Sequence, residues 1–453
     1  CGLSVARISF LTTMGLASAA MVAVAVLVAL TVVPALIGIA GRRLLARRRR
    51  TVSRNSGMVE RRPASLWVRG VTRRPWATIG AVVVLLGLCT VPVSGLHLAL
   101  TDGGFAEKGS QERETYDAVA AAYGEGYNSP VIVIADISDA STSVGAVQGL
   151  AQDLSALDGV ESIALATPNQ DRILAFVQVR PEKSQSDSST MRLVREIRSH
   201  ADDYESRYGL TDVMVTGQTA VAIDVAEALN NALIPFGIVV IGLSLILLMV
   251  VFRSIAVPLT ATLGYLLSLG AGMGAVGAVF GWGWASDLLG VSKVGAVTSF
   301  LPVIVMGVLF GLAMDYQVFL VSRMREEWSR RRGDATSATP AARREAAAAA
   351  VETGFLGSAK VVVAAAVIMV GVFMAFVHTD NVYVKPIALG LTVGIAADAF
   401  LVRMTLIPAL MAALGEKAWW LPAWLDRLLP VVDVEGEGLE QALELAEADA
   451  DHS

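Results

Sequence analysis

The sequence predicts a polytopic α-helical membrane protein with one α+β domain of the ferredoxin-like type outside the membrane. Three observations lead to this fold class. Hydrophobic residues make up 54% of the 453-residue chain, charged residues make up 17%, and the mean hydropathy is +0.59, values unlike those of an ordinary soluble domain. Several apolar runs are long enough to cross a bilayer, at roughly 20 residues per helix. One long stretch, residues 101–225, is instead periodic in hydrophobicity, which indicates a separate domain.

The N-terminal part combines an apolar run with a basic segment. The run at residues 14–40 predicts a full transmembrane helix, so residues 1–41 are expected to end a transmembrane bundle. Because the chain starts without Met, in residues typical of a helix end, we expect it to be truncated at the N-terminus. Residues 42–75 contain twelve arginines and one acidic residue, so the positive-inside rule predicts a basic cytoplasmic linker. Residues 76–100 are then expected to cross the membrane outward.

Residues 101–225 are expected to form an extracytoplasmic domain, because one span separates them from the basic linker and they carry more acids than bases. Runs rich in β-branched residues predict strands at residues 129–137, 162–166, 172–179 and 212–216. Helical spacing occurs at residues 144–157 and 191–208. The order strand, helix, strand, strand, helix, strand is the split βαβ arrangement of a ferredoxin-like domain.

Residues 226–415 predict a five-helix transmembrane bundle, and residues 416–453 a cytoplasmic tail. The five spans are expected at residues 234–252, 257–280, 297–321, 361–377 and 387–414. Arginines again fill the loop between the third and fourth of these spans, so that loop is predicted to be cytoplasmic. In the tail, the acidic stretch 433–451 is expected to be a frayed or solvated helix.

A short internal repeat indicates two homologous halves. The pattern TxxPALxxxxG occurs at residues 31–41 and again at residues 405–415. If both copies end a half, residues 76–100 are the first transmembrane helix of the second half, and most of the first half lies upstream of Cys1.

Asp315 is the clearest candidate functional residue, because it lies inside a predicted span. An ionised carboxylate there costs about 2.5–3.5 kcal/mol on insertion scales, and persists only if it is paired, protonated or in contact with water. Gly307 and Gly311 precede it at intervals of four, so all three share a helix face where a GxxxG step favours close helix contact. Tyr316 adds a phenol able to hydrogen-bond a neighbouring carboxylate. These features predict a proton relay at Asp315 and Tyr316.

The alternative for Asp315 is a structural ion pair with Arg323 or Arg325. Eight to ten residues of helix separate these positions, roughly 12–15 Å, which is too far for a direct pair. Asp398 is a second intramembrane acid. Its alternative is a structural pair with Lys360 or Arg403.

Motifs of other function classes do not occur in the sequence. The four histidines have no metal-ligand spacing, and there is no phosphate-binding loop, no HExxH and no nucleophile elbow. We therefore expect neither an ATP-driven pump nor an enzyme, and no catalytic residue, metal, cofactor or nucleic-acid partner. The energy for any transport would have to come from an ion gradient.

Residues 311–327, GLAMDYQVFLVSRMREE, resemble the signature of the second half of MMPL transporters in the RND superfamily. Further similar segments are FRSIAVP at residues 252–258, TGQTA at residues 216–220 and AFLVRMTLIPALMAALG at residues 399–415. The resemblance covers about residues 1–430. It implies RND architecture, with twelve spans and two porter domains, of which residues 101–225 would be one. It also implies that Asp315 and Tyr316 work with a matching pair in the first half.

For function, the resemblance implies export of lipids or other hydrophobic or amphiphilic molecules across the plasma membrane, driven by the proton-motive force. The implied partners are a lipid or amphiphilic substrate, protons, membrane lipids, the missing N-terminal half of the same transporter and, as one option, further copies of the chain in a homo-oligomer. The alternative is a non-transporting RND-like membrane scaffold or sensor, in which Asp315 would be structural.

Overall fold

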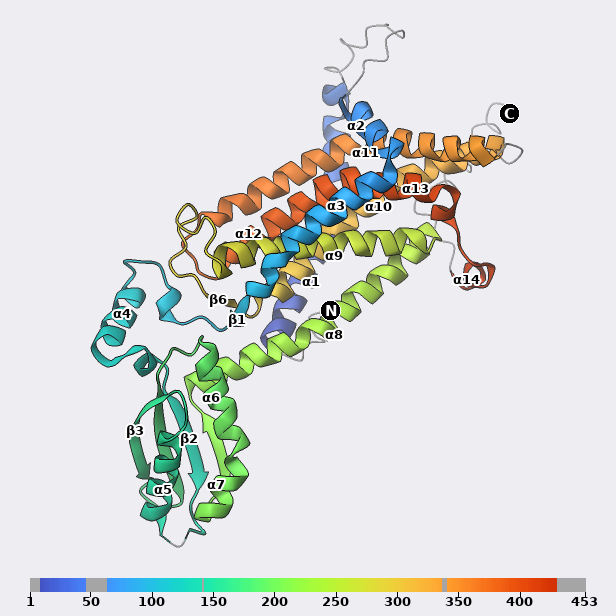
Figure 1. Cartoon of the computed structure of the whole chain (residues 1–453). Helices are drawn as coiled ribbons and strands as arrows, with labels where there is room; N and C mark the ends of the chain where they lie inside the picture. The colour runs from blue at the N-terminus through green and yellow to red at the C-terminus, as the bar shows by residue number, and fades with distance from the viewer. Residues whose placement is uncertain (1–8, 46–62, 141, 336–339, 430–453) are drawn as a thin grey trace.

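A computed structural model describes residues 9–45, 63–140, 142–335 and 340–429, and a few side chains within these ranges, including those of Asp315 and Tyr316, lie outside the described residues. A bundle of long helices carries a separate α+β domain at one end (Figure 1). We call this the domain end of the bundle. The opposite end, where α2 (Pro63–Arg73) and the C-terminal end of α10 (Leu301–Ala335) lie, is the basic end, since these segments carry Arg69, Arg73, Arg323 and Arg330.

Seven helices in the described part of the chain are long and apolar enough to cross a membrane, the number that the sequence predicts. They are α1 (Ser9–Leu45), α3 (Pro75–Thr90) with its 3-10 extension Val91–Gly95, α8 (Gln218–Phe252), α9 (Ala256–Val276), α10 (Leu301–Ala335), α11 (Pro340–Val377), and α12 (Val384–Ala396) with its continuation. That continuation is a π-helical segment, Ala397–Leu406, followed by α13 (Ile407–Leu414).

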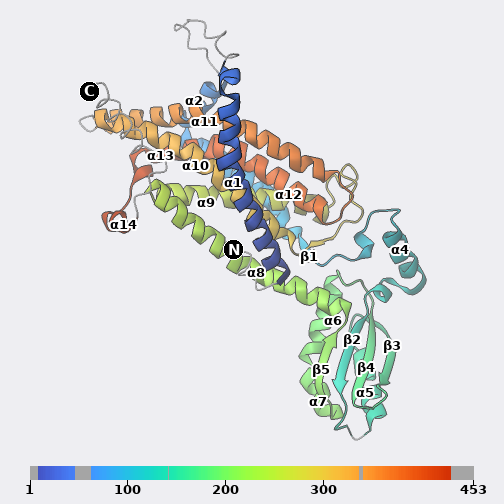
Figure 2. The ribbon, with the colours of Figure 1, turned by 180° about the vertical axis from the view of Figure 1, so that it is seen from behind.

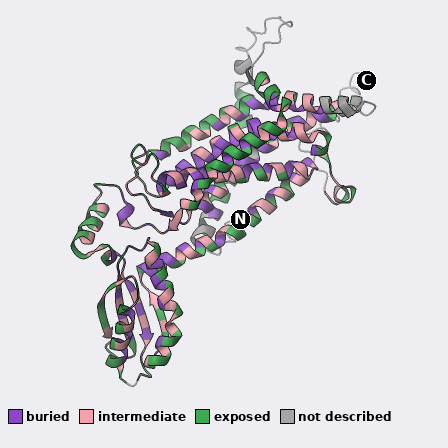
Figure 3. Ribbon diagram, in the orientation of Figure 1, coloured by how far each residue is buried: buried purple, intermediate pink, exposed green. Residues whose placement is uncertain are grey.

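Helix α9 lies inside the bundle, because its glycines let neighbouring backbones approach (Figure 3). A Cβ atom on Gly274 would lie 1.7 Å from the carbonyl oxygen of Cys89 in α3. On another side of α9, a Cβ on Gly272 would lie 2.5 Å from the carbonyl oxygen of Gly390 in α12. Helix α1 differs: residues 16–39 are all exposed, and Figure 2 shows α1 running across the outside of the bundle.

The α+β domain is built on a four-stranded antiparallel sheet with the strand order β3-β4-β2-β5. The elements follow the predicted order: β2 (Val131–Asp136), α5 (Ser143–Ser155), β3 (Val160–Pro168), β4 (Leu174–Pro181), α6 (Ser188–Ser199), α7 (Ala201–Tyr208) and β5 (Thr211–Thr216). Alternate residues of β2 are fully buried against α5 and α6, as the β-branched pattern predicts. The helical spacing at residues 191–208 corresponds to two helices, not one.

Three features differ from the predicted elements. The third span of the five-helix bundle was expected from residue 297, but β6 (Ala296–Thr298) is a strand that pairs in parallel with β1 (His97–Ala99), and α10 starts at Leu301. Pro302 in the first turn favours this helix start. The expected domain boundary at residue 225 falls inside α8, which runs unbroken from the domain into the bundle.

The third difference concerns the basic linker, residues 42–75, which contains the helix α2 (Pro63–Arg73). In the tail, the 3-10 turn Gly415–Trp419 and the short helix α14 (Ala423–Leu428) are present, whereas the acidic stretch 433–451 lies outside the described residues. Between β1 and β2, helix α4 (Gln111–Tyr123) lies beside the domain end.

Candidate functional site

Asp315 and Tyr316 lie in the middle of α10, between the buried residues Met314 and Gln317. Because their side chains lie outside the described residues, the relay remains a prediction. The two arginines of the alternative reading have other contacts. Arg323 lies 2.9 Å from Glu326, and Arg325 Nη1 donates to the carbonyl oxygen of Val251 at 3.1 Å.

The two glycines on the predicted contact face have different surroundings. A Cβ on Gly307 would lie 3.6 Å from the ring of Phe236 in α8, an ordinary packing distance. Gly311 is exposed, and a Cβ there would meet no described atom within 4 Å. Val308 and Phe319 are also exposed on α10. The face of α10 around Gly311 is therefore not covered by the described part of this chain.

A buried ion pair lies between α10 and the last span. Arg403 Nε donates to Asp398 Oδ2 at 2.5 Å, and the two side chains are 2% and 7% exposed. Arg403 is one of the two partners that the structural alternative for Asp398 names. Both residues belong to the π-helical segment Ala397–Leu406, where the wider turn brings residues five apart to one side. The same spacing joins Thr405 Oγ1 to the carbonyl oxygen of Phe400 at 2.9 Å.

This ion pair also reaches α10. Arg403 Nη2 donates to the carbonyl oxygen of Ala313, two residues before Asp315. A buried charge pair is costly to keep in an apolar bundle, and it persists only with close geometry and further hydrogen bonds. The contact to Ala313 supplies such a bond. It also ties the position of Arg403 to the helix that carries Asp315 and Tyr316.

Further polar groups surround this region of α10. Gln317 is 2% exposed, and its Nε2 atom has no hydrogen-bond partner among the described residues. Ser244 of α8 donates to the sulfur of Met314 at 3.4 Å. Sequence reasoning missed Gln317, although an amide inside an apolar span was a usable signal. Lys360, the other partner considered for Asp398, is exposed on α11.

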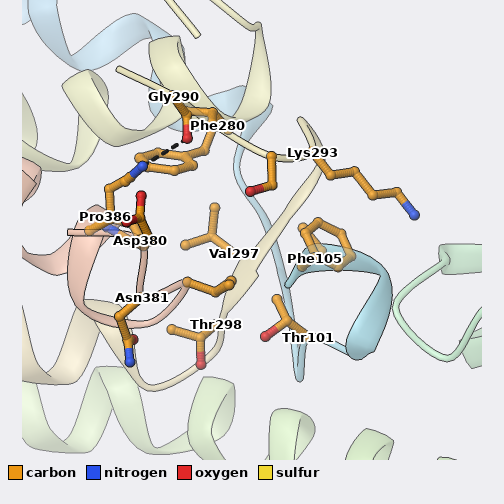
Figure 4. Close-up of a pocket in the computed structure, with 15 residues that line it drawn as sticks. Thr101, Phe105, Phe280, Gly290, Lys293, Val297, Thr298, Asp380, Asn381 and Pro386 are labelled. Carbon is orange, nitrogen blue, oxygen red and sulfur yellow. Dashed lines mark hydrogen bonds between the residues drawn. The ribbon is translucent and has the colours of Figure 1, made fainter. Parts of the chain in front are cut away.

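The domain end holds a second polar feature that the sequence did not indicate. Lys385, at the start of α12, is buried, and its Nζ donates to the carbonyl oxygens of Leu289 and Gly290 at 3.0 and 2.8 Å. Figure 4 shows the bond to Gly290 at the edge of a small cavity of about 30 Å³. Lys293 lies over the ring of Phe105, 4.9 Å from its centre. These contacts tie the loop after α9 to α12 and to the connector before α4.

Two larger cavities lie close to the domain end. One of about 670 Å³ is lined by residues of the connector, the domain and the bundle, among them Asp102, Tyr116, Gln185, Gln218, Phe300 and Tyr383. Burial, and then the Asp102 carboxylate, raises the pKa of Tyr116 to about 12, so its phenol stays protonated at neutral pH. The other, of about 450 Å³, is an almost wholly apolar groove between α3 and α9 that ends at Trp282 and Trp284.

Comparison with known proteins decides the family. A model described as MMPL family matches residues 1–83 and 113–429. The chain belongs to the MMPL family. Membrane protein YdfJ of Bacillus subtilis is 36% identical over 98% of this chain and 58% of its own length. Two further MMPL relatives are 31% identical over 91% of this chain and 42% of their own lengths: the mycolic acid-containing lipids exporter MmpL11 of Mycolicibacterium smegmatis and the heme uptake protein MmpL11 of Mycobacterium tuberculosis.

The MMPL assignment and the seven apolar helices identify a multi-pass membrane protein of the plasma membrane. The chain spans about half the length of the curated MMPL relatives that it matches.

Proposed function

We propose that this chain is part of a transporter that exports lipids or other hydrophobic or amphiphilic molecules across the plasma membrane, driven by the proton-motive force, with Asp315 and Tyr316 in the proton relay. One observation carries the proposal: the buried Asp398–Arg403 pair is bonded to α10 two residues before Asp315. Ionisable residues inside a membrane bundle mark ion or proton paths in preference to structural positions.

The Asp398–Arg403 ion pair couples protonation of Asp315 to movement of the last span. When Asp315 gains or loses a proton, its preferred surroundings change between apolar and polar, which favours a shift of α10. Arg403 donates a hydrogen bond to the carbonyl oxygen of Ala313 in α10. A shift of α10 therefore changes the geometry of the Asp398–Arg403 pair and moves the last span. In this role Asp398 and Arg403 are positioning residues and do not carry the proton themselves.

We further propose that the basic end is cytoplasmic and the α+β domain is an extracytoplasmic porter domain of ferredoxin-like type. The strand order and the antiparallel pairing of its sheet support the ferredoxin-like assignment. The continuous helix α8 links this domain to the bundle, so motion in one can reach the other. In this arrangement residues 101–225 work together with the second porter domain of the complete transporter.

The cavities support an amphiphilic substrate. The cavity at the domain end is lined by both apolar and hydrogen-bonding side chains, which suits a head group, and the apolar groove between α3 and α9 suits an acyl chain. The name of one relative refers to lipids and that of another to heme, both amphiphilic molecules. The class of substrate is therefore better supported than any single compound.

The test is the substitution Asp315→Asn in the full-length transporter, reconstituted in vesicles with a proton gradient. Because an amide cannot release a proton, we expect substrate export and coupled proton flux to be abolished while the protein still folds. Tyr316→Phe should cause a partial loss. Asp287→Asn, the same change at an exposed loop position, is the matched control and should leave both rates unchanged.

Gradient-driven export at the wild-type rate in Asp315→Asn would contradict the relay. The alternative is a non-transporting RND-like scaffold or sensor. In that case the wild-type vesicles would show no export or proton flux, and Asp315→Asn would lower stability.

A further inference from the structure

Helix α2 is an amphipathic helix at the membrane boundary, because α3 follows it directly at Pro75. Its inner face is packed against α11 and α13, with Val68 and Val71 buried. Its outer face carries Leu66 and Trp67, which are 55% and 54% exposed. Arg69 and Arg73 are exposed three and seven positions after Leu66, on the same side of the helix, and Arg74 is exposed seven positions after Trp67.

We infer that this outer face of α2 binds the phosphate head groups of anionic phospholipids. Residues 63–74 contain three arginines and no acid, and guanidinium groups pair with phosphate oxygens by two parallel hydrogen bonds. Arg69 is already paired with Glu352 at 2.6 Å, so Arg73 and Arg74 supply most of the free positive charge. Leu66 and Trp67 suit the acyl boundary beside the head groups, where apolar and aromatic side chains are stable.

The apolar residues among the arginines favour a lipid over free phosphate or an acidic peptide. A soluble anion would gain nothing from Leu66 and Trp67, whereas a bilayer lipid offers both the phosphate and the chain. Trp76, at the start of α3, is 72% exposed and extends this apolar and aromatic surface toward the span.

A hydrogen bond links this surface to the buried ion pair. Trp67 Nε1 donates to the carbonyl oxygen of Met404 at 3.0 Å, across 337 residues of sequence. An α-helical donor to that carbonyl is excluded, because the residue four positions later is Pro408, which has no N–H. Met404 is adjacent to Arg403, so a lipid that fixes α2 also restrains the π-helical segment that holds the Asp398–Arg403 pair.

The binding step is tested on the full chain in mixed micelles of phosphatidylcholine, into which phosphatidylglycerol is titrated while the melting temperature is measured. We expect phosphatidylglycerol to raise the melting temperature, because it binds the folded state. The double variant Arg73→Gln/Arg74→Gln should need roughly 30-fold more of it, since each arginine near an anionic surface contributes about one kcal/mol. Arg73→Lys/Arg74→Lys, which keeps the charge, should recover most of the response.

Arg172→Gln/Arg192→Gln, a change of two exposed arginines in the extramembrane domain, is the matched control and should titrate as the wild type does. The inference is overturned if Arg73→Gln/Arg74→Gln also titrates as the wild type does. It is equally overturned if inorganic phosphate reproduces the rise in melting temperature, because the site would then bind free phosphate.

The link to the last span is tested by hydrogen exchange. In the wild type, phosphatidylglycerol should slow amide exchange in residues 397–410. Trp67→Phe keeps an apolar ring but removes the indole donor, so it should still respond to the lipid in the melting experiment and lose the slowing of exchange. Equal slowing in Trp67→Phe would show that the Trp67–Met404 bond does not transmit lipid binding.

Discussion

At the scale of single residues, the buried charges are the most informative. Asp398 and Arg403 lie five positions apart, a spacing at which an ordinary α-helix directs side chains to different sides. The π-helical turn brings them together, and the contact to Ala313 joins them to α10. A pair this deeply buried contributes little net stability as a whole, but either member alone would be an uncompensated charge in an apolar bundle.

We therefore predict a double-mutant cycle with strong coupling. Asp398→Asn and Arg403→Gln should each lower the free energy of unfolding by about 3–5 kcal/mol, because each leaves its partner buried and unpaired. The double variant should lose much less than the sum of the two. Unfolding in detergent, followed by circular dichroism, measures all four proteins. Additive losses would mean that the two side chains do not interact in the folded protein.

At the scale of elements, α9 depends on glycine where it crosses its neighbours. Gly274 faces the backbone of α3, and the nearest atom to a Cβ there would be the carbonyl oxygen of Cys89, which cannot move without the helix. Gly277, the residue after α9, is similar, because a Cβ there would lie 2.2 Å from the carbonyl oxygen of Pro92 in the 3-10 extension of α3. The small residues set how closely α3 and α9 approach.

Gly274→Ala should therefore destabilise the bundle, by about 1–3 kcal/mol, the usual cost of overpacking a close contact. Gly242→Ala in α8 is the control, because a Cβ there would meet nothing within 4 Å. It should be neutral or slightly stabilising, since alanine favours helix more than glycine does. The melting temperatures of both variants, measured by thermal unfolding in the same detergent, test this prediction. An unchanged melting temperature for Gly274→Ala would mean that α3 and α9 are not this close.

At the scale of the whole molecule, one end of the bundle is arginine-rich and the other carries the α+β domain (Figure 1). Between α2 and the end of α13 the chain runs along the bundle an even number of times, so both segments lie at the basic end. This arrangement agrees with the charge bias along the sequence, which predicts a cytoplasmic basic end.

The predicted orientation is measurable by labelling in intact cells, in a background where Cys1 and Cys89 are replaced by serine. Ser206→Cys, exposed in the domain, should react with a membrane-impermeant thiol reagent. Ser329→Cys, exposed at the basic end, should react only after the cells are permeabilised. Ser184 is unsuitable as a reporter, because it is 5% exposed. Labelling of Ser329→Cys in intact cells would reverse the orientation.

The sequence by itself determined the seven spans, the four strands of the domain and the order of its elements, because apolar run length and the alternation of β-branched residues are local properties of the chain. Asp315 and Asp398 could be singled out for the same reason, as charges inside apolar runs. The tertiary structure decided which groups meet. Four features depend on partners far apart in sequence: the bond from Arg403 to Ala313, the bond from Trp67 to Met404, the burial of Lys385, and the strand pair that moves the start of α10 to Leu301. Such contacts are selected by packing and by the need to satisfy buried polar groups, which no local pattern records.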